Sequence, residues 1–395
     1  MSQGKRMSVL IVGAGVAGLT TAYWLRRAGH EVRVIERAAW PRREGFMIDF
    51  YGPGYAVAEE MGMISQLEKI HREIATWSFE TMTGDPLFSV PYVEVRRRLF
   101  GGRHFNFLRS DLVHLLLSRV CDHVEVRCGV SLEMLRSCGP YVAASLTDGS
   151  SMVCDLVVGA GGVHSRTRRL WLGGGDSWER YLGLDAAAFS IGDAEIRAMV
   201  GDELHTLTGP GRQVAVYPTV GDTVGVFFVH ERERTLADRS VAGIAEELRS
   251  VYGAFGGVVP ALLTKLDQAH DLYYDAVAQV RIPQWSLGRV VLVGDACQCV
   301  SPLGGQGASL AMAGARSLAR ELATDGEVGT ALSRYERRMR PAVSRAQEAG
   351  QRVARWIAPR SKLKMLARDL ALRVSVWPIA SSVMRHALGT AENTG

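Results

Sequence analysis

Three glycines near the start of the sequence have the spacing of a phosphate-binding turn. Gly13, Gly15 and Gly18 follow the apolar run 9–12 in the order G-x-G-x-x-G, and a helical pattern then runs to Gly29. In such a strand–turn–helix unit the first glycine allows the tight turn and the second lets the backbone approach a pyrophosphate. The third lets helix and strand pack closely. The pattern predicts a dinucleotide bound at the helix start.

One acidic residue narrows the choice of dinucleotide. The next strand-like run ends on Glu36, eighteen residues after Gly18. A carboxylate at this position can accept hydrogen bonds from the adenosine ribose hydroxyls, and it argues against a 2′-phosphate. Glu36 therefore favours FAD or NAD over NADP, and the motif alone leaves the choice between FAD and NAD open.

The composition is that of an ordinary globular protein. The 395 residues are 47% hydrophobic and 22% charged, enough for two domains or one large interleaved unit. The net charge of +5 comes from a scattered basic excess, which supports no nucleic-acid partner. Because no apolar run is long enough for a membrane span and no secretory signal precedes Val9, we expect a cytoplasmic protein.

Cysteines and histidines suggest no metal site. None of the six cysteines is in C-x-x-C spacing, and the one-residue spacing of Cys297 and Cys299 favours buried thiols over a zinc or redox pair. The histidines at 164, 205 and 230 are scattered, and structural or surface roles fit each of them.

The remaining pattern predicts two kinds of sheet. Apolar alternation predicts strands within 77–95, and a turn signal predicts a hairpin of strands 142–146 and 152–158. Residues 181–280 are typical of a mainly antiparallel sheet, interrupted by one helix at 240–251. Such a sheet is suited to forming one wall of a substrate cavity.

The end of the chain is predicted to be helical. A long helix is expected at 305–323, after a glycine-rich loop, and most of 331–395 has helical spacing. The tail 355–388 combines apolar residues with interspersed arginines and lysines, a pattern found in membrane-surface helices. We expect it instead to pack over the two domains.

Three motifs together resemble one family, the single-component (group A) FAD-dependent aromatic hydroxylases such as p-hydroxybenzoate hydroxylase. Tetracycline-inactivating monooxygenases share its fold. The first motif is the glycine fingerprint that ends in Glu36-Arg37. The second, DLVVGAGGVHSRTR at 155–168, is similar to D-x-x-V-G-A-D-G-x-x-S-x-x-R. The third, GDACQCVSPLGGQG at 294–307, is similar to G-D-A-x-H followed by P-x-x-G-x-G. The resemblance covers residues 7–330 and implies FAD.

The resemblance also assigns roles within the third motif. Asp295 is expected to accept hydrogen bonds from the ribityl hydroxyls, and Pro302 to lie against the isoalloxazine ring. The following glycines and helix start would stabilise negative charge on the reduced ring. Arg109 resembles the family arginine that contacts the cofactor. The predicted cofactor-binding residues are Gly13, Gly15, Val16, Ala17, Gly18, Glu36, Arg37, Arg109, Asp295, Pro302, Gly305, Gly307 and Ala308.

Four residues depart from the family pattern. Gly161 replaces an aspartate, Gln298 a histidine, Ser309 an asparagine and Gly314 a common aspartate. In the family the second motif is linked to both FAD and the transient pyridine nucleotide, so the change at Gly161 bears on the redox cycle.

The resemblance implies an α/β fold in which a Rossmann-type FAD-binding domain is interleaved with a mainly antiparallel substrate domain. C-terminal helices complete it. The expected ranges are 1–75, 101–180 and 281–330 for the FAD-binding domain, 76–100 and 181–280 for the substrate domain, and 331–395 for the helices.

The implied activity is that of an FAD-dependent monooxygenase. It would insert one oxygen atom from O2 into an aromatic or polycyclic small molecule, such as a secondary metabolite of antibiotic biosynthesis. A flavin C(4a)-hydroperoxide would carry the oxygen, with NADPH or NADH as transient reductant. No catalytic residue is identified, and Pro302, Tyr217 and His230 are candidates. The candidate pocket residues are Met47, Phe189, Tyr217 and Phe227; the phenylalanines, with Phe228, fit a core equally well.

Other functions remain open at this point. An FAD-dependent dehydrogenase or cyclase would use the same fold without net oxygenation. A non-enzymatic flavin-binding protein or redox sensor would use the cofactor site alone. The W-x-W-x-I-P segment typical of flavin halogenases is not found. The sequence does not identify the substrate or the oligomeric state.

Overall fold

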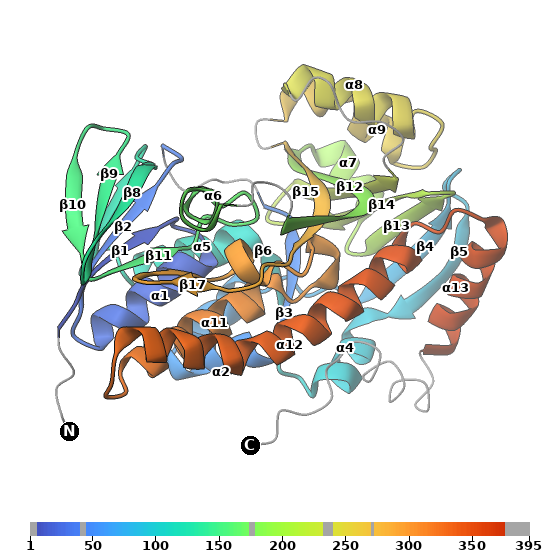
Figure 1. Ribbon diagram of the computed structural model, residues 1–395. Coiled ribbons are helices and arrows are strands. Elements are labelled where there is room, and N and C mark those ends of the chain that lie inside the picture. Colours follow the sequence, from blue (N-terminus) through green and yellow to red (C-terminus); the bar gives the residue numbers. More distant parts are fainter. Residues whose placement is uncertain (1–5, 40–44, 174–177, 232–239, 270–271, 376–395) are drawn as a thin grey trace.

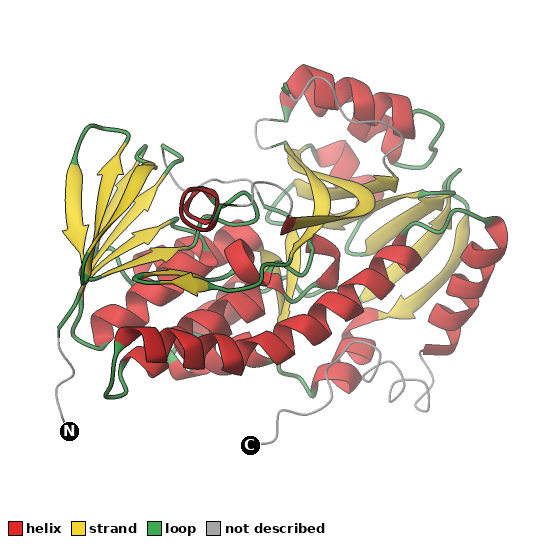
Figure 2. Cartoon of the chain, viewed as in Figure 1, coloured by secondary structure: helices red, strands yellow, loops and turns green. Residues whose placement is uncertain are grey.

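The chain is built around two large sheets. Its structure is a computed structural model. It describes residues 6–39, 45–173, 178–231, 240–269 and 272–375. Within these ranges helices and strands alternate, and the predicted α/β class is confirmed (Figure 2). Residues 376–395 of the predicted C-terminal segment lie outside the described residues.

The first sheet is six-stranded and mostly parallel (Figure 1). Its order is β17 (Ser286–Leu287), β18 (Val290–Leu292), β11 (Leu156–Gly159), β1 (Ser8–Val12), β2 (Glu31–Glu36) and β7 (Glu125–Cys128). Its central strands are short and almost wholly apolar because both faces are covered. Helices α1 (Val16–Arg27), α5 (Arg109–Ser118) and α11 (Gly307–Leu322) cover one face. A small sheet of β8 (Leu132–Cys138), β9 (Tyr141–Leu146) and β10 (Ser151–Cys154) covers the other.

The second sheet is seven-stranded and, apart from the parallel pair β4–β13, antiparallel. Its order is β16 (Tyr273–Val280), β12 (Glu179–Gly192), β15 (Thr223–Glu231), β14 (Arg212–Pro218), β13 (Leu204–Gly209), β4 (Thr76–Thr81) and β5 (Pro86–Pro91). Helices α7 (Ala194–Val200), α8 (Val241–Tyr252) and α9 (Val259–Thr264) pack on one face. The other face is turned toward the first sheet and α12 (Val328–Ile357).

The segments that supply the two sheets follow the ranges expected for the two domains, apart from β12, which begins at Glu179. The domain division itself stays a proposal. A two-stranded sheet of β3 (Met47–Tyr51) and β6 (His104–Leu108) lies between the larger sheets. Helices α2 (Pro53–Glu60) and α3 (Ile64–Ile70) follow β3.

Three details of the predicted elements were wrong. The alternating run 77–95 ends early, because α4 (Tyr92–Phe100) begins directly after β5. The predicted strand 152–158 is split at Asp155 into β10 and β11, which belong to different sheets. The second sheet is interrupted by three helices, α7, α8 and α9, instead of one.

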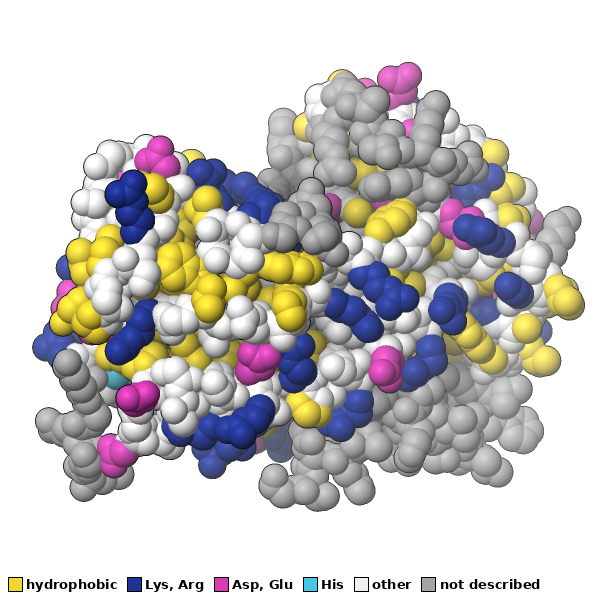
Figure 3. Space-filling model, viewed as in Figure 1, with side chains coloured by type: hydrophobic (Ala, Val, Ile, Leu, Met, Phe, Trp, Pro, Cys, Tyr) yellow, Lys and Arg dark blue, Asp and Glu magenta, His cyan; other side chains and the backbone are white. Residues whose placement is uncertain are grey.

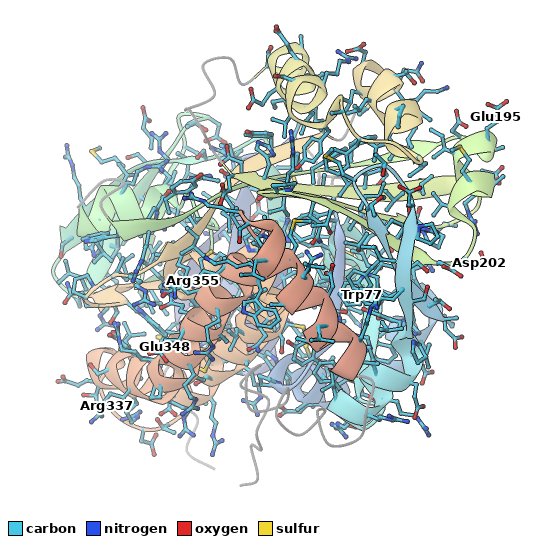
Figure 4. The ribbon with its side chains drawn as sticks, turned by 90° about the vertical axis from the view of Figure 1, so that its right-hand side faces the viewer. Trp77, Glu195, Asp202, Arg337, Glu348 and Arg355 are labelled. Carbon is cyan, nitrogen blue, oxygen red and sulfur yellow. The ribbon has the colours of Figure 1, made fainter. Side chains whose placement is uncertain are left out.

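The last helices cross from one sheet to the other. The 30-residue α12 packs on α11 and on β12, with Gln347 and Gly350 buried. Arg337 and Glu348 of this helix are exposed (Figure 4). It continues into α13 (Lys362–Ser375), which lies against β5. Among the helices within the described ranges, none is long and apolar enough to cross a membrane.

Candidate functional site

The first motif touches both of the others. A Cβ atom added to Gly13, whose φ is +116°, would lie 2.5 Å from the carbonyl oxygen of Ala160 in the second motif. A Cβ atom added to Gly294 of the third motif would lie 2.5 Å from the Cβ atom of Ala17. Both positions therefore require glycine, because neighbouring atoms approach the backbone too closely for a side chain. Segments separated by nearly three hundred residues thus meet at the start of α1.

The second motif reaches the third through a buried arginine. The side chain of Arg168, on α6 (Arg166–Leu172), is 0% exposed. It donates hydrogen bonds to the carbonyl oxygens of Val163 at 2.6 Å and Ala296 at 3.1 Å, and pairs with Glu179 at 2.5 Å. Because Glu179 begins β12, this one side chain joins the second motif, the third motif and the seven-stranded sheet.

The start of α1 fits a pyrophosphate. Gly15 is the N-cap, no side chain caps the helix, and no acidic residue stands in its first turn. The main-chain N–H groups and the helix dipole are thus available to an anion. The nearest atom to a Cβ built on Gly15 is the Arg109 guanidinium nitrogen, 3.9 Å away. Arg109, the first residue of α5, therefore supplies a positive charge where a phosphate would lie.

Glu36, the residue predicted at the adenosine end of the cofactor site, lies at the end of β2. One carboxylate oxygen accepts a hydrogen bond from the N–H of Ala14 and the other from that of Ala38, both at 2.9 Å. These bonds hold the carboxylate beside the glycine turn, where a ribose would bind. Arg37 is exposed next to it. The residues of the first motif fit an adenine dinucleotide.

Asp295 is the residue predicted at the other end of the cofactor site. This half-buried residue begins α10 (Asp295–Gln298), directly after the turn at Gly294. Burial raises the pKa of Asp295, and the Arg109 guanidinium opposes that rise. A carboxylate oxygen of Asp295 lies 3.8 Å from the Cβ position of Gly307, the first residue of α11. The predicted cofactor residues Asp295, Gly307 and Arg109 thus come together, and Ala308 follows on the first turn.

The glycine-rich loop 301–307 is held from behind by α12. Ser301 has a φ of +92°, and it is the one non-glycine residue with a positive φ in the part of the chain that the structure describes. Pro302 then opens the turn η3 (Pro302–Gly304). A Cβ atom on Gly350 of α12 would lie 2.6 Å from the carbonyl oxygen of Val300. The buried amide of Gln347 donates hydrogen bonds to the carbonyl oxygens of Val280 and Cys299, which join α12 to the segment that precedes the loop.

A buried polar cluster that the sequence analysis missed lies beneath this loop. The Asp49 carboxylate, on β3, accepts hydrogen bonds from Arg96 at 2.5 Å and Tyr92 at 2.8 Å, both on α4, and from Asn106 at 2.8 Å on β6. Burial would raise the pKa of Asp49, but the Arg96 guanidinium and the hydrogen bonds from His104 and Tyr92 together outweigh it and hold that pKa well below its usual range. Asp49 lies 3.9 Å from the Cβ position of Gly305. The sequence pattern does not reveal this cluster, because the alternating residues at the start of α4 predict a strand there.

Four rings form an aromatic wall, which we define as Phe46, Tyr217, Phe227 and Tyr273. The Phe46 ring centroid lies 5.0 Å from that of Phe227 and 5.7 Å from that of Tyr273. Tyr217 is held in place because its hydroxyl accepts the N–H of Met47 at 2.9 Å. The predicted pocket residues Met47, Tyr217 and Phe227 are therefore brought together, and Phe46 and Tyr273 join them.

The aromatic wall adjoins the cofactor site through Tyr273. Burial raises the pKa of Tyr273, with a further rise from Asp275, whereas Arg109 lowers it. Phe46 is also linked to the cofactor site, because its carbonyl oxygen accepts a hydrogen bond from the N–H of Arg109 at 3.1 Å. Within the described residues, the Tyr273 hydroxyl has no hydrogen-bond partner, so it is available to a bound molecule.

Two other predicted residues lie on the opposite face of the same sheet. Phe189 packs against Phe228 in the core beneath α7–α9, with ring centroids 6.0 Å apart. His230 is buried there too, with Nδ1 3.3 Å from the Tyr252 hydroxyl and Nε2 3.5 Å from the Tyr274 hydroxyl. Successive side chains of a strand alternate between faces, so neither residue reaches the aromatic wall.

Two of the four departures from the family pattern fit each other. The Gln298 amide, 2% exposed, donates to the Tyr335 hydroxyl at 2.8 Å and lies over Gly314. A Cβ atom on Gly314 would come within 2.7 Å of that amide. The Gln298 side chain therefore fits because position 314 has no side chain. Ser309 joins α11 to α2, since its hydroxyl accepts the N–H of Gly54 at 2.7 Å.

The other residues singled out in the sequence have ordinary surroundings. Gly161 is exposed, and a Cβ atom there would meet nothing closer than 3.4 Å, so the backbone does not require glycine. Cys297 and Cys299 are buried, as expected, and burial raises the pKa of both thiols.

His164, in the second motif, bridges the two sheets. Its Nε2 lies 2.8 Å from a carboxylate oxygen of Asp275 on β16, and its Nδ1 lies 3.6 Å from Glu179. The hydrogen bond to Asp275 raises the pKa of His164 and Glu179 adds to the rise, whereas partial burial and Arg169 lower it. Protonation of His164 thus strengthens the contact.

This contact should make thermal stability depend on pH. Because the folded pKa of His164 is raised, its contribution is complete below the unfolded value of about 6.5 and is lost as pH rises through the folded pKa. We expect the Tm of wild type to exceed that of His164→Asn at low pH, and the difference to vanish at higher pH. Thermal scans across this range measure it, with the exposed His123→Asn variant as control. A constant difference would contradict the assignment.

Comparisons with known proteins agree with this geometry. Residues 115–349 match a family described as an FAD binding domain, and residues 8–45 match one described as an FAD dependent oxidoreductase. A flavin-dependent monooxygenase from an unknown prokaryotic organism is 30% identical, over 91% of each chain. An FAD-dependent monooxygenase of Sarocladium schorii is 30% identical, over 87% of this chain and 86% of the relative. The crystal structure of tetracycline destructase Tet(55) covers 100% of both chains, with a TM-score of 0.83 and 26% identity.

Proposed function

Because this chain belongs to the FAD-binding family of flavin-dependent monooxygenases, we propose that it inserts one oxygen atom of O2 into an aromatic or polycyclic small molecule. FAD is the cofactor, and NADPH or NADH is proposed as the reductant. The observation that carries the proposal is the contact between the cofactor site and the aromatic wall through Tyr273 and Phe46.

The chain would hold FAD along one continuous path. Glu36 binds the adenosine ribose, the start of α1 and Arg109 bind the pyrophosphate, and Asp295 binds the ribityl chain. When bound, FAD supplies the redox chemistry, taking a hydride from the nicotinamide and activating O2. The uncapped start of α11 would offer N–H groups and a helix dipole that stabilise negative charge on the ring.

The aromatic wall would position the substrate and exclude water from the reacting atoms. Its surface is formed by rings, which suits a flat apolar molecule, and the Tyr273 hydroxyl can donate or accept one orienting hydrogen bond. The structural relative Tet(55) is called a tetracycline destructase, which supports a polycyclic substrate.

A second candidate function is an FAD-dependent dehydrogenase or cyclase without net oxygenation. It is favoured by Gly161, where the family pattern has an aspartate linked to the pyridine nucleotide. The backbone does not require glycine here, because a side chain would fit at this position. The missing carboxylate therefore bears on how the cofactor is reduced.

Anaerobic reduction followed by isotope labelling separates the two candidates. Purified FAD-loaded protein is mixed with NADPH or NADH and a panel of polycyclic phenols that includes tetracycline. Bleaching of the flavin and a product carrying one atom of ¹⁸O from ¹⁸O2 are expected. If neither nucleotide bleaches the flavin with any substrate, the monooxygenase proposal fails. An oxidised product without added oxygen would favour the dehydrogenase or cyclase.

A further inference from the structure

Helix α13 turns its leucines to solvent. Leu363, Leu366 and Leu370 are 77%, 66% and 64% exposed, and their spacing of three and four residues places them on one side of the helix. With the exposed Ala367 between them, they form what we call the leucine stripe. A surface helix ordinarily turns such a stripe inward, against the core.

Two arginines of α13 contact the rest of the protein. The side chain of Arg368 is 6% exposed; it pairs with Asp369 at 2.6 Å and donates to the carbonyl oxygen of Ile357. Further along, Arg373 donates to the carbonyl oxygen of Leu87 at 2.9 Å. The helix is therefore anchored to β5 and α12 by polar contacts, with its apolar side free.

Positive charges flank the leucine stripe. At 100° per residue, Lys364 lies on one side of the stripe and Arg373 on the other, and both are exposed. Over residues 352–373 the charged side chains are seven basic and one acidic. Figure 3 shows hydrophobic and basic side chains adjoining at the edge where Figure 1 places α13.

We propose that α13 docks on an anionic lipid surface, with the leucine stripe in the interface and Lys364 on the headgroups. Apolar insertion together with attraction to anionic lipid is the combination that holds a helix in a membrane plane. A second copy of the chain fits less well. A two-fold contact between stripes would set the flanking cations of one copy against those of the other.

Docking through α13 would bring the substrate-facing sheet to the lipid. The helix lies against β5, the edge strand of that sheet. Apolar polycyclic molecules partition into bilayers, so a protein bound in this way meets them where they accumulate. This consequence rests on the proposed function, whereas the docking itself does not.

Vesicle co-sedimentation of the full chain tests the proposal. Wild type is expected to bind phosphatidylcholine vesicles that contain phosphatidylglycerol, to bind pure phosphatidylcholine more weakly, and to be released by salt. Replacing all three leucines of the stripe by glutamine, a good helix former, should weaken binding about a hundredfold. Lys364→Glu should weaken binding to the anionic vesicles only.

The matched control is Met199→Gln, which changes an exposed apolar side chain on α7 and should bind as wild type does. Circular dichroism and flavin content, unchanged in every variant, show that the fold is intact. Equal binding by wild type and the triple variant would overturn the proposal, as would no preference for the anionic vesicles. A wild-type dimer in sedimentation that the triple variant converts to monomer would also overturn it, in favour of a second copy. Saturable binding of an acidic peptide at the stripe, without vesicle binding, would do the same.

Discussion

Gly13→Ala should lose bound FAD and at least about 3 kcal/mol of unfolding free energy, because two costs add at this position. Its φ of +116° disfavours any side chain, and the new Cβ atom would meet the Ala160 carbonyl at 2.5 Å. Relieving the clash means separating the first motif from the second. Flavin absorbance of the purified protein and its urea midpoint measure the two effects.

The control for this substitution is Gly29→Ala. Gly29, after α1, also has a positive φ, +90°, but a Cβ atom there meets nothing within 4 Å. We expect this variant to keep its FAD and to lose only about 1 kcal/mol, the cost of the backbone conformation alone. Equal losses in the two variants would mean that the contact with Ala160 is unimportant.

Arg168→Met should cost about 3–5 kcal/mol of unfolding free energy, because it leaves Glu179 of this buried ion pair without its positively charged partner. Burial lowers the pKa of Arg168, while Glu179 opposes this and keeps the guanidinium paired. The substitution leaves Glu179 without that partner and removes donors from the carbonyls of Val163 and Ala296. Urea unfolding followed by tryptophan fluorescence measures the loss.

A surface pair provides the comparison. Arg97 forms an ion pair with Glu94 on α4, but its side chain is 68% exposed, so Arg97→Met should change the unfolding free energy by less than about 0.5 kcal/mol. In the double variant Arg168→Met/Glu179→Gln, part of the loss should be recovered because the stranded charge is gone. If Arg168→Met cost no more than Arg97→Met, the buried pair would not be what ties the motifs to the sheet.

The cofactor site could be predicted from sequence because its chemistry depends on backbone geometry. The turns at Gly13 and Gly294 require positive φ and close approach, and both demands appear as glycines at fixed spacing. Glu36 and Asp295 follow from the same logic, since Glu36 ends a strand beside such a turn and Asp295 comes directly after one.

The substrate side could not be predicted to the same extent. Phe227 and Phe228 are neighbours, yet one faces the cofactor site and the other the core beneath α7–α9. Which of them faces the flavin depends on the register of β15 against β12, and no local pattern encodes that. Phe46 and Tyr273 are far apart in the sequence and meet only in the folded sheet.

The Asp49 cluster was missed for a related reason. Residues 92–95, Tyr-Val-Glu-Val, alternate as a strand does, and only the packing of Tyr92 and Arg96 against Asp49 selects a helix there. Tertiary contacts overrode the local preference.

The fit between Gln298 and Gly314 constrains the order in which these positions can change by mutation. With glutamine at 298, any side chain at 314 collides with the amide, which would have to leave Tyr335. A shorter residue at 298 removes that obstacle while glycine still stands at 314. A mutational path toward the family's histidine and aspartate is therefore open in one direction, with position 298 changing first. The reverse order passes through a destabilised intermediate sequence.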